Sequence, residues 1–315
     1  MKTVLHYRAS PGFCERLALA ASAVDIEAVV VDETDWEGFD REIADADVLL
    51  HVLEPVTAAH IAGAPRLRLI QKIGVGVNTI DLEAARARGI AVCNMPGTNS
   101  RAVAEQTLLL ILACLRRLTG FDRLMRQGQG WSWPREWQQG LAELGGRTVG
   151  LVGFGAVPRI LAPILAALGA EIIYTGRRRY PEIRYAFVDK QELLRRADIV
   201  SLHVPLDAAT RGFLDAAALA ALKPGAIVVN VARGGLIDEA ALLAGLASGR
   251  IAAAGLDVFA TEPAPAESPL VAHPNVVASP HIAWLTRETF ERSLAVAVEN
   301  CRRLRTGTAF LHQVI

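Results

Sequence analysis

The chain has 315 residues, of which 52% are hydrophobic and 21% charged, so it can bury a large core and its length suggests two domains. Its 33 basic and 33 acidic residues cancel, which excludes the broad positive field that favours nucleic acid or an anionic membrane. Its apolar runs are too short or too glycine-broken to span a bilayer, and the N-terminus lacks a long apolar signal core. The four cysteines are far apart without metal-site spacing, so we expect no metal, reduced thiols and a cytoplasmic location.

Apolar, β-rich runs alternate with helical stretches, which predicts a parallel α/β architecture. In the first hundred residues the predicted strands are Thr3–Tyr7, Glu27–Val31, Val48–Val52, Leu69–Ile73 and Ala91–Asn94. The helices predicted between them include Phe13–Ala23, Thr57–Ala62 and Leu82–Gly89. A turn-rich break, M-P-G-T-N, follows at residues 95–99.

A long helix is predicted over Ser100–Leu118, with apolar residues almost all round, and a helix of that kind is buried. The segment Gly120–Leu144 then interrupts the α/β rhythm and holds Trp131, Trp133 and Trp137, three of the five tryptophans. Tryptophan clusters outside a strand–helix repeat often anchor a protein interface. A loop folded over its own domain explains them equally well.

A second α/β series runs from Thr148 to about Ile282, and a long amphipathic helix follows at about Thr286–Leu304. The strands predicted in this series are Leu151–Val152 within the β-rich run Thr148–Val152, Ile172–Tyr174, Ile199–Leu202, Ala226–Asn230, Ala252–Gly255 and Val276–Ala278.

The second series opens with a strand, a glycine turn and a helix, which contains most of the dinucleotide fingerprint G-x-G-x-x-G. Gly153 permits the tight turn, and Gly155 lacks a Cβ, so the backbone can approach a pyrophosphate closely. The N-terminus of the following helix, predicted over Arg159–Leu168, offers free N–H groups and a positive dipole end to that anion. Pro158 replaces the third glycine, and proline is tolerated in the first turn of a helix.

The residue type at the end of the next strand determines whether NAD or NADP is preferred. An acid there binds the ribose 2′-hydroxyl of NAD, whereas arginine accommodates the 2′-phosphate of NADP. Here Gly176 is followed by Arg177, Arg178 and Arg179, and arginine grips phosphate with parallel charge-assisted hydrogen bonds. This pattern favours NADP, although three arginines in a loop are also compatible with a solvated surface run.

Three later segments place a charged or titratable residue after a predicted strand: Arg233, Glu262 and His281. Active sites of open parallel sheets lie at the carboxyl ends of strands. An arginine matches both oxygens of a substrate carboxylate, and a histidine can give or take one proton near neutrality. A glutamate on the other ring nitrogen would orient the histidine and favour its protonated form. With a nicotinamide, these three groups suffice to reduce a 2-keto acid.

The chain resembles the D-isomer-specific 2-hydroxyacid dehydrogenase family over essentially its whole length. The resemblance is carried by LIQKIGVGVNTIDLEAARARGIAVCNMPGTNSRAVAEQT, TVGLVGFGAVPR, ADIVSLHVPLDAATRG, LKPGAIVVNVARGGLIDEAALLAGLASGRIAAAGLDVFATEP and PHIAW. It implies that Arg233 binds the substrate carboxylate and that Glu262 pairs with His281, the acid/base. It also implies that the Val75-Gly76 backbone holds the carboxylate. The implied cofactor-binding residues are Gly153, Phe154, Gly155, Ala156, Val157, Thr175, Arg177, Arg178, His203, Val204, Pro205, Val231, Ala232, Arg233, Asp257 and His281.

The resemblance implies two doubly wound parallel-sheet domains, with a Rossmann-type cofactor domain inserted into a flavodoxin-like substrate domain. Residues 1–98 and 284–315 would form the substrate domain. Residues 99–283 would form the dinucleotide-binding domain, with a dimerisation helix and arm at about 100–144 that build a homodimer. The active site is expected in the cleft between the domains.

The expected function is that of an NADPH-preferring oxidoreductase, with NAD(H) possible, that reduces a small 2-keto acid to the D-2-hydroxy acid. Glyoxylate or hydroxypyruvate is favoured, because the Y-T-G-R run at residues 174–177 is similar to NADP-using glyoxylate/hydroxypyruvate reductases. A phosphoglycerate dehydrogenase or another D-2-hydroxyacid dehydrogenase is the alternative. A nucleotide-sensing corepressor of the same fold is an alternative of another class.

Overall fold

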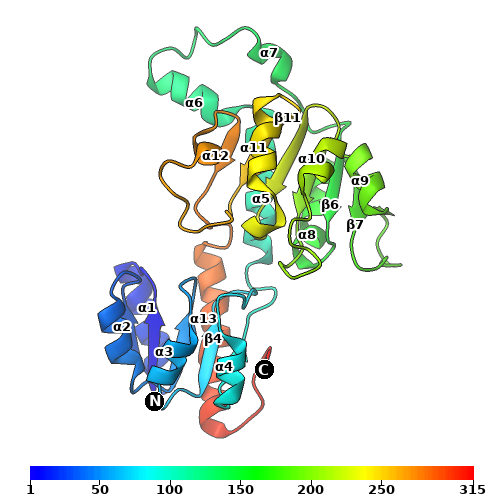
Figure 1. Cartoon of the computed structure of the whole chain (residues 1–315). Helices are drawn as coiled ribbons and strands as arrows, with labels where there is room; N and C mark the ends of the chain where they lie inside the picture. Colours follow the sequence, from blue (N-terminus) through cyan, green and yellow to red (C-terminus); the bar gives the residue numbers. More distant parts are fainter. The chain divides into compact units, whose positions relative to one another are not determined.

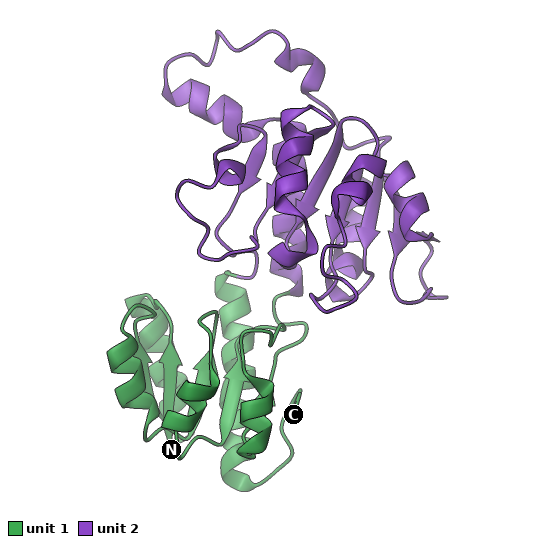
Figure 2. Ribbon diagram, in the orientation of Figure 1, with its two compact units in different colours: residues 1–99, 285–315 green, residues 100–284 purple.

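The computed structural model describes residues 1–315 as two compact units (Figures 1 and 2). Unit 1 comprises Met1–Asn99 and Leu285–Ile315, and unit 2 comprises Ser100–Trp284. Unit 2 is therefore an insertion in the sequence of unit 1. Each unit is built around its own sheet.

Unit 1 contains a five-stranded sheet in the order β2-β1-β3-β4-β5, and every neighbouring pair is parallel. The strands are β1 (Lys2–His6), β2 (Glu27–Val31), β3 (Val48–His51), β4 (Leu69–Lys72) and β5 (Ala91–Cys93). This is the strand order of a flavodoxin-like sheet, which reverses direction between β1 and β3. The reversal places successive right-handed crossover helices on opposite faces.

The helices of unit 1 are α1 (Pro11–Ser22), α2 (Trp36–Ile43), α3 (Ala58–Gly63), α4 (Leu82–Ala87) and α13 (Arg287–Thr306). Helices α2, α3 and α4 enclose a core that includes Phe39, Ile61 and Ala85. Helices α1 and α13 pack against each other, and α13 also contacts β4. Side chains of Ser, Thr or Asp cap the N-termini of these helices, so short polar residues fix where each helix begins.

Unit 2 contains a seven-stranded sheet in the order β12-β11-β10-β9-β6-β7-β8, which is also parallel throughout. The strands are β6 (Thr148–Val152), β7 (Glu171–Thr175), β8 (Ala186–Phe187), β9 (Ile199–Leu202), β10 (Ala226–Asn230), β11 (Ile251–Leu256) and β12 (Val276–Ala278). The first six strands take the 3-2-1-4-5-6 arrangement of a dinucleotide-binding sheet, and β12 extends one edge. The predicted fold class is therefore confirmed.

Two sets of helices pack on this sheet. Helices α5 (Ser100–Leu115) and α8 (Ala156–Ala167) contact each other, and α5 also contacts β10, β11 and β12. Helices α9 (Lys190–Arg196), α10 (Ala216–Ala221) and α11 (Glu239–Ala247) form a row over a core that includes Leu193, Leu219 and Leu242. The short helix α12 (Pro269–Ala272) and a 3-10 turn at Gly234–Leu236 complete the unit.

The prediction of one helix over Ser100–Leu118 is wrong at its end. Helix α5 stops at Leu115, and Arg117 takes a left-handed conformation with φ of +49° before α6 (Leu118–Arg126) begins. That conformation breaks the helical path. Within the single chain, most of α5 is buried but Leu109 and Leu112 are exposed.

Residues 118–144, which we call the arm, contain α6 and α7 (Trp137–Gly140) and extend away from the sheet of unit 2 (Figure 1). The ring of Phe121 packs edge-on against Trp133 and Trp137, at 5.8 and 5.2 Å between ring centres. Trp131, in contrast, is 93% exposed. Two tryptophans thus hold the arm together, and the third is left on its surface.

Candidate active site and nucleotide-binding edge

The loop between β6 and α8 has the shape that a pyrophosphate requires. Gly153 has a φ of +92°, and a Cβ there would lie 2.7 Å from the carbonyl oxygen of His203, so only glycine fits. A Cβ on Gly155 would meet no atom within 4 Å, so the space in front of this residue is open. No side chain caps the N-terminus of α8, which leaves its free N–H groups available to an anion.

Pro158 lies in the first turn of α8 and is buried. The helix begins at Ala156, three residues earlier than predicted, and continues past the proline to Ala167. This agrees with the expectation that proline is tolerated there, because the N–H it lacks has no helical partner at that position. The loop Gly153–Gly155 and the start of α8 therefore fit a dinucleotide. Phe154 lies within this loop, and Val157 lies in the first turn of α8.

The arginines after β7 lie at the same edge. Arg177, Arg178 and Arg179 are all exposed, whereas Thr175 is buried at the end of the strand. The Arg178 guanidinium lies 5.1 Å from the centre of the Tyr180 ring, and that of Arg159, on α8, lies 4.9 Å from it. Arg159 also forms an ion pair of 2.8 Å with Glu182. A cluster of cations and one aromatic ring therefore follows β7.

Glu262 and His281 are paired in the structure. His281 Nδ1 lies 2.7 Å from Glu262 Oε2, and the other carboxylate oxygen accepts the backbone N–H of Phe259 at 2.9 Å. Burial opposes ionisation of this carboxylate, but the hydrogen bond and charge of His281, the Phe259 N–H and the charge of Arg233 together hold the pKa of Glu262 below its usual value. Glu262 is therefore an anion that orients the imidazole through Nδ1.

Arg233 follows β10, and its positive charge interacts with the negative charge of Glu262. Burial lowers the pKa of the Arg233 guanidinium and the charge of Glu262 raises it; arginine remains a cation under such conditions. Its carbonyl accepts from Asn230 Nδ2 at 2.9 Å. A Cβ on the next residue, Gly234, would overlap the backbone of Phe259 at 1.8 Å. The glycine lets the turn that carries Arg233 touch the turn before Glu262.

Asp257 holds the loop that carries His281. Its carboxylate accepts the N–H groups of Ile282 at 3.0 Å and Ala283 at 2.8 Å, and its carbonyl accepts the N–H of His281 at 2.7 Å. Burial raises the pKa of the Asp257 carboxyl, against the opposing effect of these hydrogen bonds and of Ser279. His281 has a φ of +54°, a conformation uncommon outside glycine that surrounding contacts must maintain.

The remaining predicted residues lie in the loops that follow β9, β10 and β4. His203, Val204 and Pro205 follow β9, and burial lowers the pKa of His203 to about 3, so it is neutral. The segment Val231–Ala232 follows β10. Val75 and Gly76 belong to unit 1, in the loop after β4, where Asn94 Nδ2 donates to the Val75 carbonyl at 2.9 Å. Arg233, Glu262 and His281 belong to unit 2.

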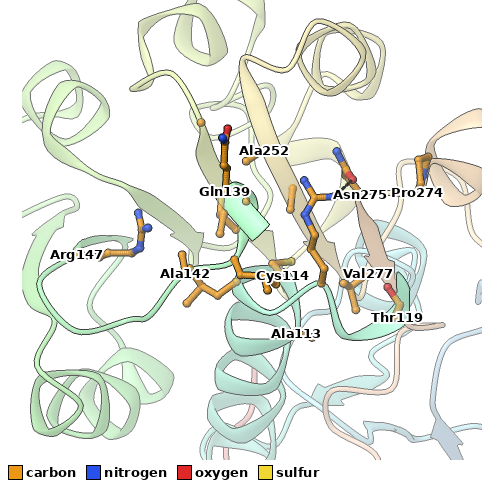
Figure 3. A pocket seen from close by; sticks show the side chains of 17 residues that line it. Ala113, Cys114, Thr119, Gln139, Ala142, Arg147, Ala252, Pro274, Asn275 and Val277 are labelled. Carbon is orange, nitrogen blue, oxygen red and sulfur yellow. Dashed lines mark hydrogen bonds between the residues drawn. The ribbon is translucent and has the colours of Figure 1, made fainter. Parts of the chain in front are cut away.

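A separate pocket of about 230 Å³ lies at the opposite edge of the same sheet (Figure 3). It is lined by Gly225, Ala252 and Asn275, near the amino ends of β10, β11 and β12, and by arm residues such as Gln139. Arg117 Nη1 donates to Asn275 Oδ1 at 3.0 Å across this pocket. Since ligands of open α/β sheets bind at the carboxyl ends of strands, this pocket is not the nucleotide site.

Residues 108–283 match the family described as D-isomer specific 2-hydroxyacid dehydrogenase, NAD binding domain. The chain belongs to this family. The predicted family is thereby confirmed, and so is a nicotinamide dinucleotide as the cofactor class. None of the helices is both long and apolar enough to cross a membrane.

Individual relatives agree with the family match. The glyoxylate reductase of Aeropyrum pernix is 38% identical over 91% of this chain and 89% of its own length. The D-3-phosphoglycerate dehydrogenase of Mycobacterium tuberculosis is 38% identical over 92% of this chain. The chain spans only 55% of that relative's length. The crystal structure of the TT0316 protein from Thermus thermophilus superposes with a TM-score of 0.90, 36% identity and full coverage of both chains.

Two residues beside the site were missed by sequence reasoning. Ser279 donates a hydrogen bond to the Asp257 carboxylate, and Gln106 donates one to Ser279. Ser279 immediately precedes the P-H-I motif, so its position at the site could have been noticed. Gln106 is 173 residues away from Ser279 in the sequence, and no local pattern signals their contact.

Proposed function

We propose that this protein reduces a small 2-keto acid to the D-2-hydroxy acid, with His281 as the acid/base. The observation that carries this proposal is the 2.7 Å contact between His281 Nδ1 and the ionised Glu262. Because Glu262 occupies Nδ1, Nε2 is the atom that gives a proton to the substrate oxygen. A nicotinamide dinucleotide held at the Gly153–Gly155 loop would supply the hydride that the substrate carbon receives.

Arg233 anchors the substrate carboxylate in this proposal. Its planar guanidinium can donate two parallel hydrogen bonds to a carboxylate, and its partial burial strengthens them. The Val75-Gly76 loop of unit 1 offers backbone N–H groups suited to a carboxylate.

Glyoxylate and hydroxypyruvate are the substrates we favour. The support is the similarity to the Aeropyrum pernix glyoxylate reductase along 89% of that enzyme. The phosphorylated keto acid of a phosphoglycerate dehydrogenase is the alternative, since the Mycobacterium tuberculosis relative is equally identical where the two chains match.

A screen of keto acids tests both parts of this proposal. NADPH oxidation is measured with glyoxylate, hydroxypyruvate and 3-phosphohydroxypyruvate, and the configuration of the hydroxypyruvate product is determined. We expect turnover with glyoxylate and hydroxypyruvate, and D-glycerate from the latter. A higher kcat/KM for the phosphorylated substrate contradicts the substrate assignment, and the absence of turnover with every keto acid contradicts the function.

NADPH is the cofactor we favour over NADH. The exposed Arg177 and Arg178 follow β7, where an acid would otherwise bind the ribose 2′-hydroxyl. Arg178 and Arg159 lie over one ring, that of Tyr180, which holds both cations beside the end of the strand. Glu182 already pairs with Arg159, so a 2′-phosphate would compete with this carboxylate for the arginine.

Cofactor ratios test this assignment. Arg177→Ala and Arg178→Ala should each raise the Michaelis constant for NADPH far more than that for NADH, because only the 2′-phosphate loses a partner. Arg195→Ala, an exposed arginine on α9, is the matched control and should change neither. Equal or better efficiency of the unmodified protein with NADH contradicts the proposal.

The two units divide the work in this proposal. Unit 2, which contains the fingerprint loop and matches the family's NAD-binding domain, binds the dinucleotide. Unit 1, with the Val75-Gly76 loop, serves as the substrate domain. Helix α5 and the arm, at about residues 100–144, form the dimerisation region.

A homodimer would cover apolar side chains that are exposed in the single chain. They are Leu109 (51%), Leu112 (37%), Leu118 (53%), Met125 (55%) and Trp131 (93%). A cluster of this kind on one helix and its neighbouring arm is typical of an interface, where tryptophan supplies large contact area. Sedimentation at low micromolar concentration should give twice the 33.8 kDa mass of one chain, and a monomer contradicts the proposal.

A further inference from the structure

A chain of hydrogen bonds links helix α5 to the loop that carries His281. Gln106 Nε2 donates to Ser279 Oγ at 3.0 Å, and Ser279 Oγ donates to Asp257 Oδ1 at 2.5 Å. The sequence separates Gln106 from Ser279 by 173 positions, so this contact exists only because α5 packs on β11 and β12. We call Gln106, Ser279 and Asp257 the relay.

The relay ends on the residue that fixes the histidine loop. Asp257 receives three consecutive backbone N–H groups, from His281 on its carbonyl and from Ile282 and Ala283 on its carboxylate. The carbonyl of His281 accepts in turn from Trp284 Nε1 at 3.0 Å. These contacts hold His281 at its positive φ, and the direction of its side chain follows from that backbone conformation.

The Asp257 carboxylate sets the direction of the hydrogen bonds in the relay. The Asp257 carboxylate accepts the backbone N–H groups of Ile282 and Ala283, and an ionised carboxylate only accepts hydrogen bonds. The one proton of the Ser279 hydroxyl therefore points to Asp257, so its lone pairs face Gln106 and require a donor. The amide nitrogen of Gln106 is that donor. A carboxylate at position 106 would instead demand the hydroxyl proton and take it from Asp257.

We propose that Gln106 and Ser279 are positioning residues for His281, which act through Asp257 to hold the imidazole against Glu262 at the substrate oxygen. This proposal rests on the proposed role of His281 as the acid/base. Proton transfer demands close geometry, and a displacement of about 1 Å caused by a distant residue can cost on the order of a hundredfold in rate. Neither residue touches the substrate or the cofactor in this proposal.

Four variants separate a positioning role from a merely structural one. Ser279→Ala removes both hydrogen bonds of the hydroxyl, and Ser279→Thr keeps the hydroxyl as the rescue. Gln106→Glu reverses the polarity of the relay, and Gln106→Met removes the donor at similar volume. Ser248→Ala and Gln191→Met are the matched controls, since both residues are exposed in unit 2 outside the relay.

The first measurement is steady-state reduction with NADPH. We expect Ser279→Ala and Gln106→Glu to lower kcat roughly tenfold or more, while the KM for the keto acid and the affinity for NADPH change less than about twofold. Ser279→Thr should recover most of the lost kcat. Equal kcat values in the relay variants and the controls overturn the proposal, as does a loss of NADPH binding and thermal stability that accompanies every loss of turnover.

The second measurement needs no substrate. In protein labelled with ¹⁵N-histidine, the Nδ1–H proton that His281 donates to Glu262 should give a downfield resonance, assigned by its loss in Glu262→Gln. We expect Ser279→Ala and Gln106→Glu to shift or broaden this resonance and the controls to leave it unchanged. If the unmodified protein reduces no keto acid, the proposed function fails, and this resonance still decides whether the relay positions His281. An unchanged resonance in both relay variants overturns the proposal.

Discussion

The two halves of the carboxyl edge of the unit 2 sheet are built by opposite means. Beside β6, β7 and β9 the site is formed by backbone and open space. Gly153 and Gly155 have no side chains, and no side chain caps the N-terminus of α8. Beside β10, β11 and β12 the site consists of side chains that hold one another, with Glu262 and Asp257 each accepting several hydrogen bonds. One half offers backbone N–H groups and space, and the other offers placed charges.

This difference assigns each half a separate part of the reaction. A dinucleotide needs a wide, preformed cradle with N–H donors for its pyrophosphate. Proton transfer and carboxylate binding need charged groups held within fractions of an ångström, in a site that excludes water. A change in one half should therefore alter cofactor binding and leave the chemistry, and a change in the other half should do the reverse.

The largest effect is expected from Arg233→Ala in the side-chain half. Loss of a bidentate, charge-assisted contact should cost about 3 kcal/mol or more, which corresponds to roughly a hundredfold or greater loss of kcat/KM for the keto acid. Both turnover and keto acid binding should fall, whereas the dissociation constant of NADPH should stay within a few-fold of the original. An Arg233→Ala protein with unchanged kcat/KM would show that the carboxylate is bound elsewhere.

Replacing Gly153 and Gly155 by alanine, one at a time, tests whether the loop beside β6 is an open cradle for the cofactor. Gly153→Ala forces a Cβ to 2.7 Å from the His203 carbonyl at a φ of +92°, so it should lower the free energy of unfolding by about 1–3 kcal/mol. Gly155→Ala places its Cβ in open space, so stability should be unchanged and only NADPH affinity should fall. Thermal unfolding and nucleotide titration check the pair, and equal destabilisation by both changes would contradict an open cradle at Gly155.

The smallest effect is expected from Glu262→Gln, which keeps the shape of the pair and removes its charge. The pKa of Glu262 lies below its usual value because of His281 and Arg233, so the stabilisation from this pair is present at neutral pH and is lost as pH falls through that lowered value. A neutral amide does not titrate in this range and makes a weaker hydrogen bond to the imidazole. In the unmodified protein, keto acid reduction should decline as pH falls through the lowered pKa of Glu262; Glu262→Gln should lose this acidic decline, with a loss of roughly tenfold in kcat. An unchanged pH–rate profile would remove Glu262 from the mechanism.

The parallel α/β architecture follows from hydrophobic runs and glycine turns in the sequence, because buried parallel strands are apolar. The doubly wound strand order was implied by the family resemblance. The two-residue strand β8 was not predicted, since both its residues are exposed and it has no apolar run. Helix α2 was not named either, although Asp35 caps it. The break after α5 depends on the conformation of Arg117, whose guanidinium bonds to the distant Asn275.

The candidate site divides in the same way. The fingerprint loop is a local pattern, because its glycines can be recognised from the strand and helix that directly flank them. Arg233, Glu262 and His281 each follow a strand, but the pairing of Glu262 with His281 depends on how β11 and β12 lie side by side. Gln106 lies on a helix far along the chain from Ser279, and a polar residue on a helix is ordinarily a solvated one. Long-range contacts of this kind have no local signature.

The proton donor is the central claim, and His281→Ala tests it most directly. Single-turnover reduction of hydroxypyruvate is followed with unmodified and variant protein, each saturated with NADPH as shown by titration. We predict equal NADPH affinity and a rate of reduction at least about a hundredfold lower in the variant, in line with the loss of a general acid. A His281→Ala protein that reduces hydroxypyruvate at near the original rate would contradict the mechanism and the assignment of the site.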